Sequence, residues 1–217
     1  MLPRILSNTE SNFVILPMKN SKKNTLKSLL HLLVLSCFTF NGSTQTVLID
    51  SQVWCTKNLD VSVFRNGDTI PQAKTNMEWE KANALNQPAW CYYENKRSNG
   101  KKYGKIYNGY ALMDPRGLAP AGFHIPSNEE WNHLLIATTD TVESKTVLNN
   151  FDFNLTTGGF RYDGGSFNGL GKEAFWWSST EYYPNSNNAF IVYCNSKTLE
   201  SEIHGYDWGF YIRCIKD

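Results

Sequence analysis

The sequence predicts an α+β fold of short antiparallel strands, two short helices and a loop-rich periphery. The chain has 217 residues, of which 41% are hydrophobic and 14% aromatic, so it can bury a core of one domain. Long apolar helices are absent, whereas Gly, Asn, Ser and Tyr are frequent, as in folds of many short strands. Capping boxes followed by apolar residues at helical spacing mark the two helices.

The mature part of the chain begins with two predicted strands, residues 46–49 and 53–55, joined by a turn. A helix is predicted over about residues 76–86, because Thr75 and Glu78 have capping-box spacing. Residues 88–93 are predicted to be extended and buried. The polar stretch 94–102 that follows is predicted to be a loop, and the tyrosine-rich stretch 102–112 to pack tightly.

The second helix is predicted over about residues 128–138. Ser127 and Glu130 form its capping box, and Trp131 heads its apolar face. The proline-bounded segment 119–126 before this helix is unsuited to a central strand. His124 in this segment and His133 in the helix lack a ligand set around them in the sequence, so both are predicted to be structural or surface residues.

The chain is organised around the stretch 175–181, Phe-Trp-Trp-Ser-Ser-Thr-Glu. In an extended segment Trp176 and Trp177 point to opposite faces, so the two rings are predicted to fill the core on both sides. A hairpin is predicted over residues 157–167, with Asp163 and Gly164 in its turn. Further strands are predicted over 189–194 and 208–215, separated by a polar connection over 195–207.

The N-terminal region indicates export. Residues 18–27 are basic, residues 28–40 are apolar, and residues 41–45 are small and polar, as in a signal peptide cleaved near Thr44. The apolar run is shorter than the roughly 20 residues of a membrane-spanning helix. A buried N-terminal helix is the alternative interpretation.

Two further alternatives concern processing. Residues 1–17 are unsuited to a signal, so they are interpreted as an upstream extension or a wrongly assigned start, with translation beginning at Met18. Residues 18–44 are then the signal peptide and 45–217 the domain. Cys37 follows a loose lipobox and is the lipidated residue if the protein is a lipoprotein, which would anchor it at the outer membrane rather than release it.

Charge and cysteine content limit the partners and the covalent links that can be predicted for the chain. Residues 1–44 carry five basic and one acidic side chain, so without them the formal net charge of +1 becomes −3. A basic patch is absent from the sequence, which excludes nucleic acid as a predicted partner. The cysteines that remain in an exported chain suggest two disulfides, with three possible pairings. They are Cys55, Cys91, Cys194 and Cys214.

Several motifs, taken in order along the chain, resemble those of a known protein family. They are Val53-Trp54, Asn58-Leu59, Trp90-Cys91-Tyr92, Tyr103-Gly104-Lys105-Ile106-Tyr107, the run 122–131 (Gly-Phe-His-Ile-Pro-Ser-Asn-Glu-Glu-Trp), Gly158-Gly159-Phe160-Arg161, Trp176-Trp177-Ser178-Ser179-Thr180-Glu181 and Gly209-Phe210-Tyr211-Ile212-Arg213-Cys214. Residues 47–217 resemble the Fibrobacter succinogenes major paralogous domain, a family of exported proteins of Bacteroidetes and Fibrobacteres.

The resemblance implies a C-type-lectin-like fold, similar also to that of formylglycine-generating sulfatase activators, in which the N- and C-terminal strands meet beside two helices. It also bears on the disulfides. Many members have a cysteine where this chain has Ala119, and members without it often keep the positions of Cys91 and Cys214. The resemblance therefore implies a Cys91–Cys214 disulfide, with Cys55–Cys194 as the additional pair.

The predicted function is that of an exported, non-enzymatic binding module for a glycan or a protein, without cofactor or metal. Loops rich in Tyr, Asn, Ser and Gly suit adaptable recognition. The candidate ligand-binding residues are Tyr162, Asp163, Phe167, Asn168, Glu181, Tyr182, Tyr183, Asn185, Asn187 and Asn188. The alternative for these residues is that they are ordinary loop positions with tyrosines packed on the core. Calcium-dependent sugar binding is not supported, because Glu181 to Asn185 departs from the Glu-Pro-Asn motif of C-type lectins.

Two other functions remain open at this point. A structural or adhesive role at the cell surface fits a single domain that acts by assembly. An enzyme related to formylglycine-generating proteins would need activated thiols beside a substrate groove. The cysteines here have the spacing of structural residues, and catalytic residues are therefore not predicted.

Overall fold

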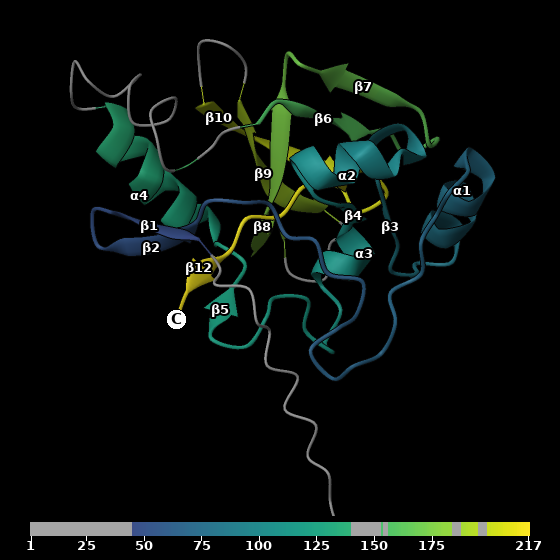
Figure 1. Cartoon of the computed structure of the whole chain (residues 1–217), viewed down its shortest axis with the longest axis horizontal. Helices are drawn as coiled ribbons and strands as arrows, with labels where there is room; N and C mark the ends of the chain where they lie inside the picture. The colour runs from purple at the N-terminus through teal and green to yellow at the C-terminus, as the bar shows by residue number, and fades with distance from the viewer. Residues whose placement is uncertain (1–44, 140–152, 154–155, 184–187, 195–198) are drawn as a thin grey trace, which may run out of the picture. The chain divides into compact units, whose positions relative to one another are not determined.

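The computed structural model describes residues 45–139, 153, 156–183, 188–194 and 199–217, all within the compact unit Gly42–Asp217 (Figure 1). The predicted signal peptide, the alternative start at Met18 and the lipidation candidate Cys37 lie outside the described residues. The strands are β1 (Thr46–Ile49), β2 (Gln52–Cys55), β3 (Trp90–Cys91), β4 (Ile106–Asn108), β5 (Phe123–His124), β6 (Gly158–Arg161), β7 (Phe167–Leu170), β8 (Ala174–Glu181), β9 (Asn188–Cys194), β10 (Leu199–Gly205), β11 (Gly209–Phe210) and β12 (Ile215–Lys216). The helices are α1 (Asn76–Ala84), α2 (Arg97–Tyr103), α3 (Gly109–Leu112) and α4 (Asn128–Thr139), with a 3₁₀ turn at Tyr93–Asn95.

One sheet joins the two ends of the domain. Its strand order is β1-β2-β12-β5, and each neighbouring pair is antiparallel. Figure 1 shows the late strand β12 beside the early hairpin β1–β2. The segment before α4 supplies only the two-residue strand β5 at the edge of this sheet, as its prolines predicted.

The second sheet has the order β10-β9-β8-β6-β11-β4-β3, with β7 paired to β6. Its neighbours are antiparallel except β6 and β8, which are parallel where Gly159 lies opposite Ala174. The described residues thus form a mixed α+β fold with mainly antiparallel sheets and few helices, which confirms the predicted fold class at this level.

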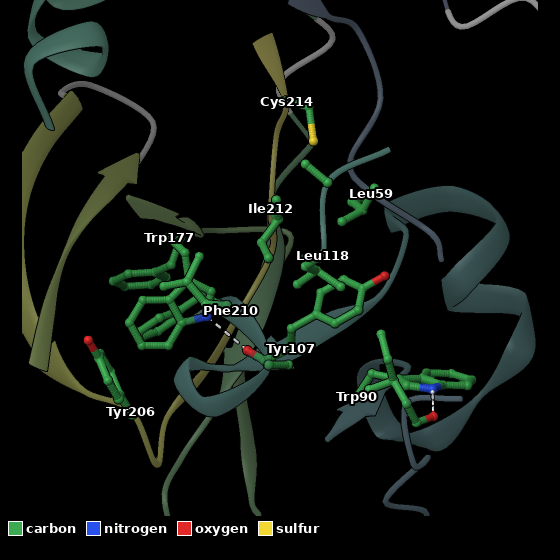
Figure 2. Packing of buried hydrophobic residues seen from close by; sticks show 14 of the residues in the cluster. Leu59, Trp90, Tyr107, Leu118, Trp177, Tyr206, Phe210, Ile212 and Cys214 are labelled. Atoms are coloured by element: carbon green, nitrogen blue, oxygen red, sulfur yellow. Dashed lines mark hydrogen bonds between the residues drawn. The ribbon is translucent and has the colours of Figure 1, made fainter. Parts of the chain in front are cut away.

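The tryptophan pair on β8 lies at the centre of the core, as predicted. Both rings are completely buried, and they belong to different hydrophobic clusters on the two faces of the strand. Trp177 packs at 4.8 Å from the ring of Phe210, and its indole N–H donates to the carbonyl of Tyr107 at 2.8 Å (Figure 2). Trp176 packs toward Trp131 of α4, and its indole N–H donates to Asn58 at 2.8 Å.

Two arginines are fully buried and are held by oxygen acceptors of neighbouring segments. Arg161 of β6 donates to the carbonyls of Gly165, Ala73 and Thr75 at 2.8, 3.1 and 2.9 Å. Arg213, between β11 and β12, donates to Asn58 Oδ1 and to the carbonyls of Cys55 and Phe153. Burial lowers the pKa of Arg213 to about 10, so it remains a cation at neutral pH. Both residues join segments that are far apart in the sequence.

The two predicted helices are confirmed together with their caps. At α1 the Thr75 hydroxyl accepts from the amide of Glu78, whose carboxylate accepts from the amide of Thr75, each at 3.1 Å. At α4 the Ser127 hydroxyl accepts from the amide of Glu130 at 3.2 Å, and the Glu130 carboxylate accepts from the amide of Ser127 at 2.8 Å. The capping boxes therefore determine where both helices begin.

The stretch 94–102 was predicted to be a loop and is instead mostly helix α2. Its polar side chains do not reveal the helix, because close packing rather than an apolar stripe holds it. Gly100 lies so near the Tyr92 ring that a Cβ there would be 2.1 Å from it. The Asn99 amide also donates to the carbonyl of Tyr93 at 2.9 Å.

The C-terminal region differs from the prediction in two respects. The predicted polar connection contains strand β10, which pairs along its whole length with β9. The predicted single strand 208–215 is divided into β11 and β12, which belong to different sheets. Between them, Tyr211 bridges to Trp176 and the carbonyl of Ile212 accepts from Leu59. The segment therefore crosses from one sheet to the other.

Neither the implied Cys91–Cys214 disulfide nor the Cys55–Cys194 pair is formed in this structure. Cys55, Cys91 and Cys214 are buried free thiols. Cys91 lies in β3 of one sheet, whereas Cys214 precedes β12 of the other sheet, and the two cysteines belong to different hydrophobic clusters. The side chain of Cys194 lies outside the described residues.

Candidate binding surface

A group of half-buried aromatic rings lies where the hairpin β6–β7 meets the chain between β10 and β11. The ring of Trp208 lies 5.1 Å from that of Tyr162 and 4.4 Å from that of His204. All three side chains are partly accessible to solvent. We call Tyr162, His204 and Trp208, with the neighbouring Asp163 and Asp207, the Trp208 surface.

Strand pairing brings the two halves of the Trp208 surface together. Arg161 of β6 lies opposite Gly209 of β11 in an antiparallel pair. The residues that follow Arg161 therefore run beside those that precede Gly209, so Tyr162 meets Trp208 and Asp163 comes near Asp207.

Helix α1 holds both segments in place, the one that follows β6 and the one that precedes β11. The side-chain amide of Asn83 donates to the carbonyl of Asp207 at 2.7 Å and to that of Asp163 at 3.3 Å. The indole N–H of Trp79 donates to the carbonyl of Asp207 at 3.1 Å. Gly165, at φ +84°, lets the hairpin turn approach α1, since a Cβ there would be 2.7 Å from the backbone of Asn76.

The Trp208 surface rests on a packed aromatic floor. Phe160 stacks on Trp208 at 5.8 Å, and the rings of Phe160 and Phe175 are 4.7 Å apart. Phe210 stacks on Phe175 at 5.3 Å. These three phenylalanines are buried, and the half-buried rings of the Trp208 surface pack on them.

The two carboxylates give the surface an acidic edge. Burial raises the pKa of Asp207, and the nearby charge of Asp163 raises it further. Asp163 itself is exposed, and its carboxylate accepts from the amide of Gly164 at 2.8 Å. Carboxylate oxygens beside aromatic faces can accept hydrogen bonds from a ligand whose apolar side lies on the rings.

The structure distributes the predicted site residues over separate places. Tyr162 and Asp163 belong to the Trp208 surface, and Asn168 donates to the hydroxyl of Tyr162 at 3.2 Å. Phe167 points inward instead, where its ring lies 5.1 Å from that of Tyr93 and the guanidinium of Arg161 lies 4.7 Å above it. Phe167 therefore has a structural role in this hairpin.

The end of β8 carries a second group of predicted residues. Tyr182 and Tyr183 are 39% and 61% exposed, and their rings are 4.3 Å apart. Glu181 accepts from the hydroxyl of Tyr206 at 3.0 Å. Burial, followed by the hydrogen bond and charge of Glu181, raises the pKa of the Tyr206 hydroxyl.

Three of the four predicted asparagines have side chains that the structure does not describe. Asn185 and Asn187 lie outside the described residues, as does the side chain of Asn188, the first residue of β9. Conversely, the sequence did not indicate His204, Asp207 or Trp208 as site residues. Their proximity to Tyr162 follows from the pairing of β6 with β11, for which the sequence offers no local signal.

An open depression of about 620 Å³ lies on another part of the domain, beside β5 and α4. Three of its charged side chains, those of Arg65, His124 and Glu130, are engaged within the protein. His124 lies 2.8 Å from both Glu130 and Asp217. Arg65 donates to the carbonyls of Ala119 and Phe123, each at 3.1 Å. Because these contacts fasten loops and the last residues of the chain, this depression is better explained by structure than by ligand binding.

His124 is thus structural, as predicted. Burial lowers its pKa, but the hydrogen bonds and charges of Asp217 and Glu130 together outweigh burial and raise it above the ordinary value. Within the described parts of the chain, no group of three or more His, Cys, Asp or Glu side chains is placed to hold a metal ion. In the same parts, no helix has the length and apolar character to cross a membrane.

The described residues form a mixed α+β domain that presents half-buried aromatic rings and two carboxylates on its surface. The family model of the Fibrobacter succinogenes major domain matches residues 47–146, and this part of the chain belongs to that family. The match confirms the resemblance seen in the sequence motifs. The motifs after residue 146, among them the tryptophan pair of β8, lie beyond the matched residues. Comparison with curated proteins finds no match, and neither does comparison with solved structures.

Proposed function

We propose that this domain is an exported, non-enzymatic binding module that holds a saccharide against the Trp208 surface. The observation that carries the proposal is the half-buried Trp208 ring, 5.1 Å from the Tyr162 ring and flanked by Asp163 and Asp207. The C–H face of a sugar ring can lie on an aromatic face, while its hydroxyls donate to carboxylate oxygens. Neutral sugars suit this site better than acidic ones, because the carboxylates would repel a negative charge.

The proposal includes the finer points of fold and location. The pairing of the early hairpin β1–β2 with the late strand β12 supports a C-type-lectin-like arrangement. The basic and apolar segments over 18–44 support secretion or display at the outer cell surface. Lipidation at Cys37 is the alternative route, and it would anchor the module at the outer membrane.

The described thiols support a non-enzymatic role. Burial raises the pKa of Cys91 to about 11, and burial raises those of Cys55 and Cys214 as well. Because the pKa values of these thiols are raised, little thiolate is present at neutral pH, and the thiolate is the reactive form of cysteine. An activity related to formylglycine generation would need at least one thiol that is both ionised and accessible.

A second candidate is a structural or adhesive role in which the domain contacts another exported protein. The exposed tyrosine pair Tyr182–Tyr183 favours it, since tyrosines are enriched in protein interfaces. Mutations can distinguish the contribution of this tyrosine pair to binding from that of the Trp208 surface.

The experiment is a glycan-array screen of the folded protein, followed by titration of any hit with three variants. Trp208→Ala and Asp163→Asn are expected to weaken glycan binding about tenfold or more, which corresponds to about 1.4 kcal/mol. Tyr183→Ala is the matched control and is expected to bind normally. Unchanged unfolding transitions show that the variants are folded.

Two results would refute the proposed site. Binding that is lost in Tyr183→Ala but kept in Trp208→Ala would move recognition to the end of β8. Silence across the array from a folded sample would favour the protein-contact function instead.

A further inference from the structure

Two buried thiols, those of Cys55 and Cys214, lie on neighbouring segments near the two ends of the domain. Strands β2 and β12 are antiparallel, with Trp54 opposite Ile215. Continuing this register by one residue places Cys55, the last residue of β2, opposite Cys214, which immediately precedes β12. The amide of Cys55 donates to the carbonyl of Cys214 at 2.9 Å, which agrees with this register.

The two cysteines also share a face. Cys55 and Cys214 belong to one hydrophobic cluster, whereas their neighbours Trp54 and Ile215 belong to the other. This division follows from the alternation of side chains along a strand. Residues directly opposite on one face of an antiparallel pair have Cβ atoms about 4.5–5.5 Å apart, and disulfides join Cβ atoms about 3.5–4.5 Å apart. The two side chains must therefore move closer together before a bond can form between them.

The electrostatics agree with this proximity. Burial raises the pKa of Cys214, and the neighbouring Cys55 raises it further, whereas the guanidinium of Arg213 opposes the shift. Arg213 also donates to the carbonyl of Cys55 at 3.2 Å, which fixes β2 beside the last strand. By contrast, Cys91 lies in the other cluster, beside Arg161.

We propose that Cys55 and Cys214 form a cross-strand disulfide when the protein folds under oxidising conditions, and that the structure described above is its dithiol form. The two S–H bonds break, one S–S bond forms, and two protons and two electrons leave. A disulfide reagent such as oxidised glutathione accepts them and is reduced to two thiols. Because both thiols are buried in the folded dithiol form, the bond forms during folding rather than by attack on the finished domain.

The bond would fasten hairpin β1–β2 to β12, segments that are far apart in the sequence. Closing so long a loop restricts the unfolded chain, so oxidation is expected to raise the melting temperature by about 5–15 °C. This inference is independent of the proposed glycan site, because the cysteines and Trp208 are different features of the fold.

The test is peptide mapping of the full chain after refolding with oxidised glutathione. Free thiols are alkylated, the protein is digested without reductant, and the linked peptides are identified by mass spectrometry. The expected product is a Cys55 peptide joined to a Cys214 peptide, two hydrogens lighter than their sum. Because mapping uses the unsubstituted chain, it does not depend on whether any variant folds.

Three variants sharpen the test. Cys55→Ser and Cys214→Ser are each expected to remove the linked peptide and the difference in melting temperature between oxidised and reduced samples. Cys91→Ala is the matched control and is expected to retain both. Linkage of Cys55 or Cys214 to Cys91, Cys194 or Cys37 would overturn the proposal, as would recovery of both cysteines alkylated or bound to glutathione.

Discussion

Replacing Arg161 with methionine tests whether a buried cation without a carboxylate partner can be essential to the core. Arg161 is fully buried, and its guanidinium donates to three backbone carbonyls, those of Gly165, Ala73 and Thr75. Among the described residues, no ion pair is recorded for it. Methionine fills a similar volume but offers no donor.

The expected loss follows from these contacts. A buried acceptor left without a donor costs about 1–3 kcal/mol, so three of them cost about 3–9 kcal/mol. Removing a buried charge returns about 1–4 kcal/mol. With the middle of each range, the free energy of unfolding is expected to fall by about 3.5 kcal/mol, a large part of the ~5–15 kcal/mol typical of a domain.

Two further variants show whether the reasoning is right. Arg161→Lys keeps the positive charge but can donate to fewer of the three carbonyls. It is therefore expected to destabilise the domain at least as much as Arg161→Met does. Arg65 makes the same type of contacts, to the carbonyls of Ala119, Pro120 and Phe123, but is exposed. Water can replace its donors, so Arg65→Met is expected to lose about 1 kcal/mol.

The assay for these variants is urea unfolding followed by tryptophan fluorescence, with linear extrapolation to water. A loss under about 1 kcal/mol in Arg161→Met would refute the reasoning. It would mean that water or a local rearrangement satisfies the carbonyls of Gly165, Ala73 and Thr75.

Two other predictions concern the charges and caps. The pKa of His124 is raised in the folded state, so its contribution to stability is present below the unfolded value of 6.5 and is lost as pH rises through the folded value. The pKa of Glu130 is lowered, against burial, by Ser127 and His124, so its contribution is lost as pH falls through the folded value. Melting temperature measured upward from pH 6.5 should therefore fall less steeply in His124→Gln, and equal slopes would contradict this. Thr75→Ala removes the hydroxyl that caps α1 and should lower the free energy of unfolding, measured in urea, by about 1 kcal/mol. Thr75→Ser keeps the hydroxyl and should not lower it. Equal losses in the two variants would show that the hydroxyl cap is dispensable.

Local patterns in the sequence predicted those parts of the fold that local forces determine. The caps Thr75 and Ser127 act within one helical turn, so the positions of α1 and α4 could be predicted from neighbouring residues. The opposite orientations of Trp176 and Trp177 follow from strand geometry alone. Helix α2 was missed because its packing depends on Gly100 meeting Tyr92, a contact that propensity does not reveal.

The candidate site was predicted only in part for a similar reason. Tyr162 and Asp163 stand in a recognisable hairpin turn, so they could be singled out. Trp208 and Asp207 join them only through the pairing of β6 with β11, which is long-range. The implied Cys91–Cys214 disulfide is not formed for a similar reason, since Cys91 lies in β3 of one sheet and Cys214 precedes β12 of the other.

The late strand β12 between β2 and β5 has a consequence for biosynthesis. Cys55 and Arg213 are hydrogen bonded although they lie 158 positions apart in the sequence. At roughly 5–20 residues per second, synthesis of the intervening chain takes about 8–30 s. During that interval hairpin β1–β2 lacks the strand against which it packs, so the ribosome-bound nascent chain cannot complete this sheet. A polypeptide that must wait in this way stays available to a translocation machinery that threads unfolded chains.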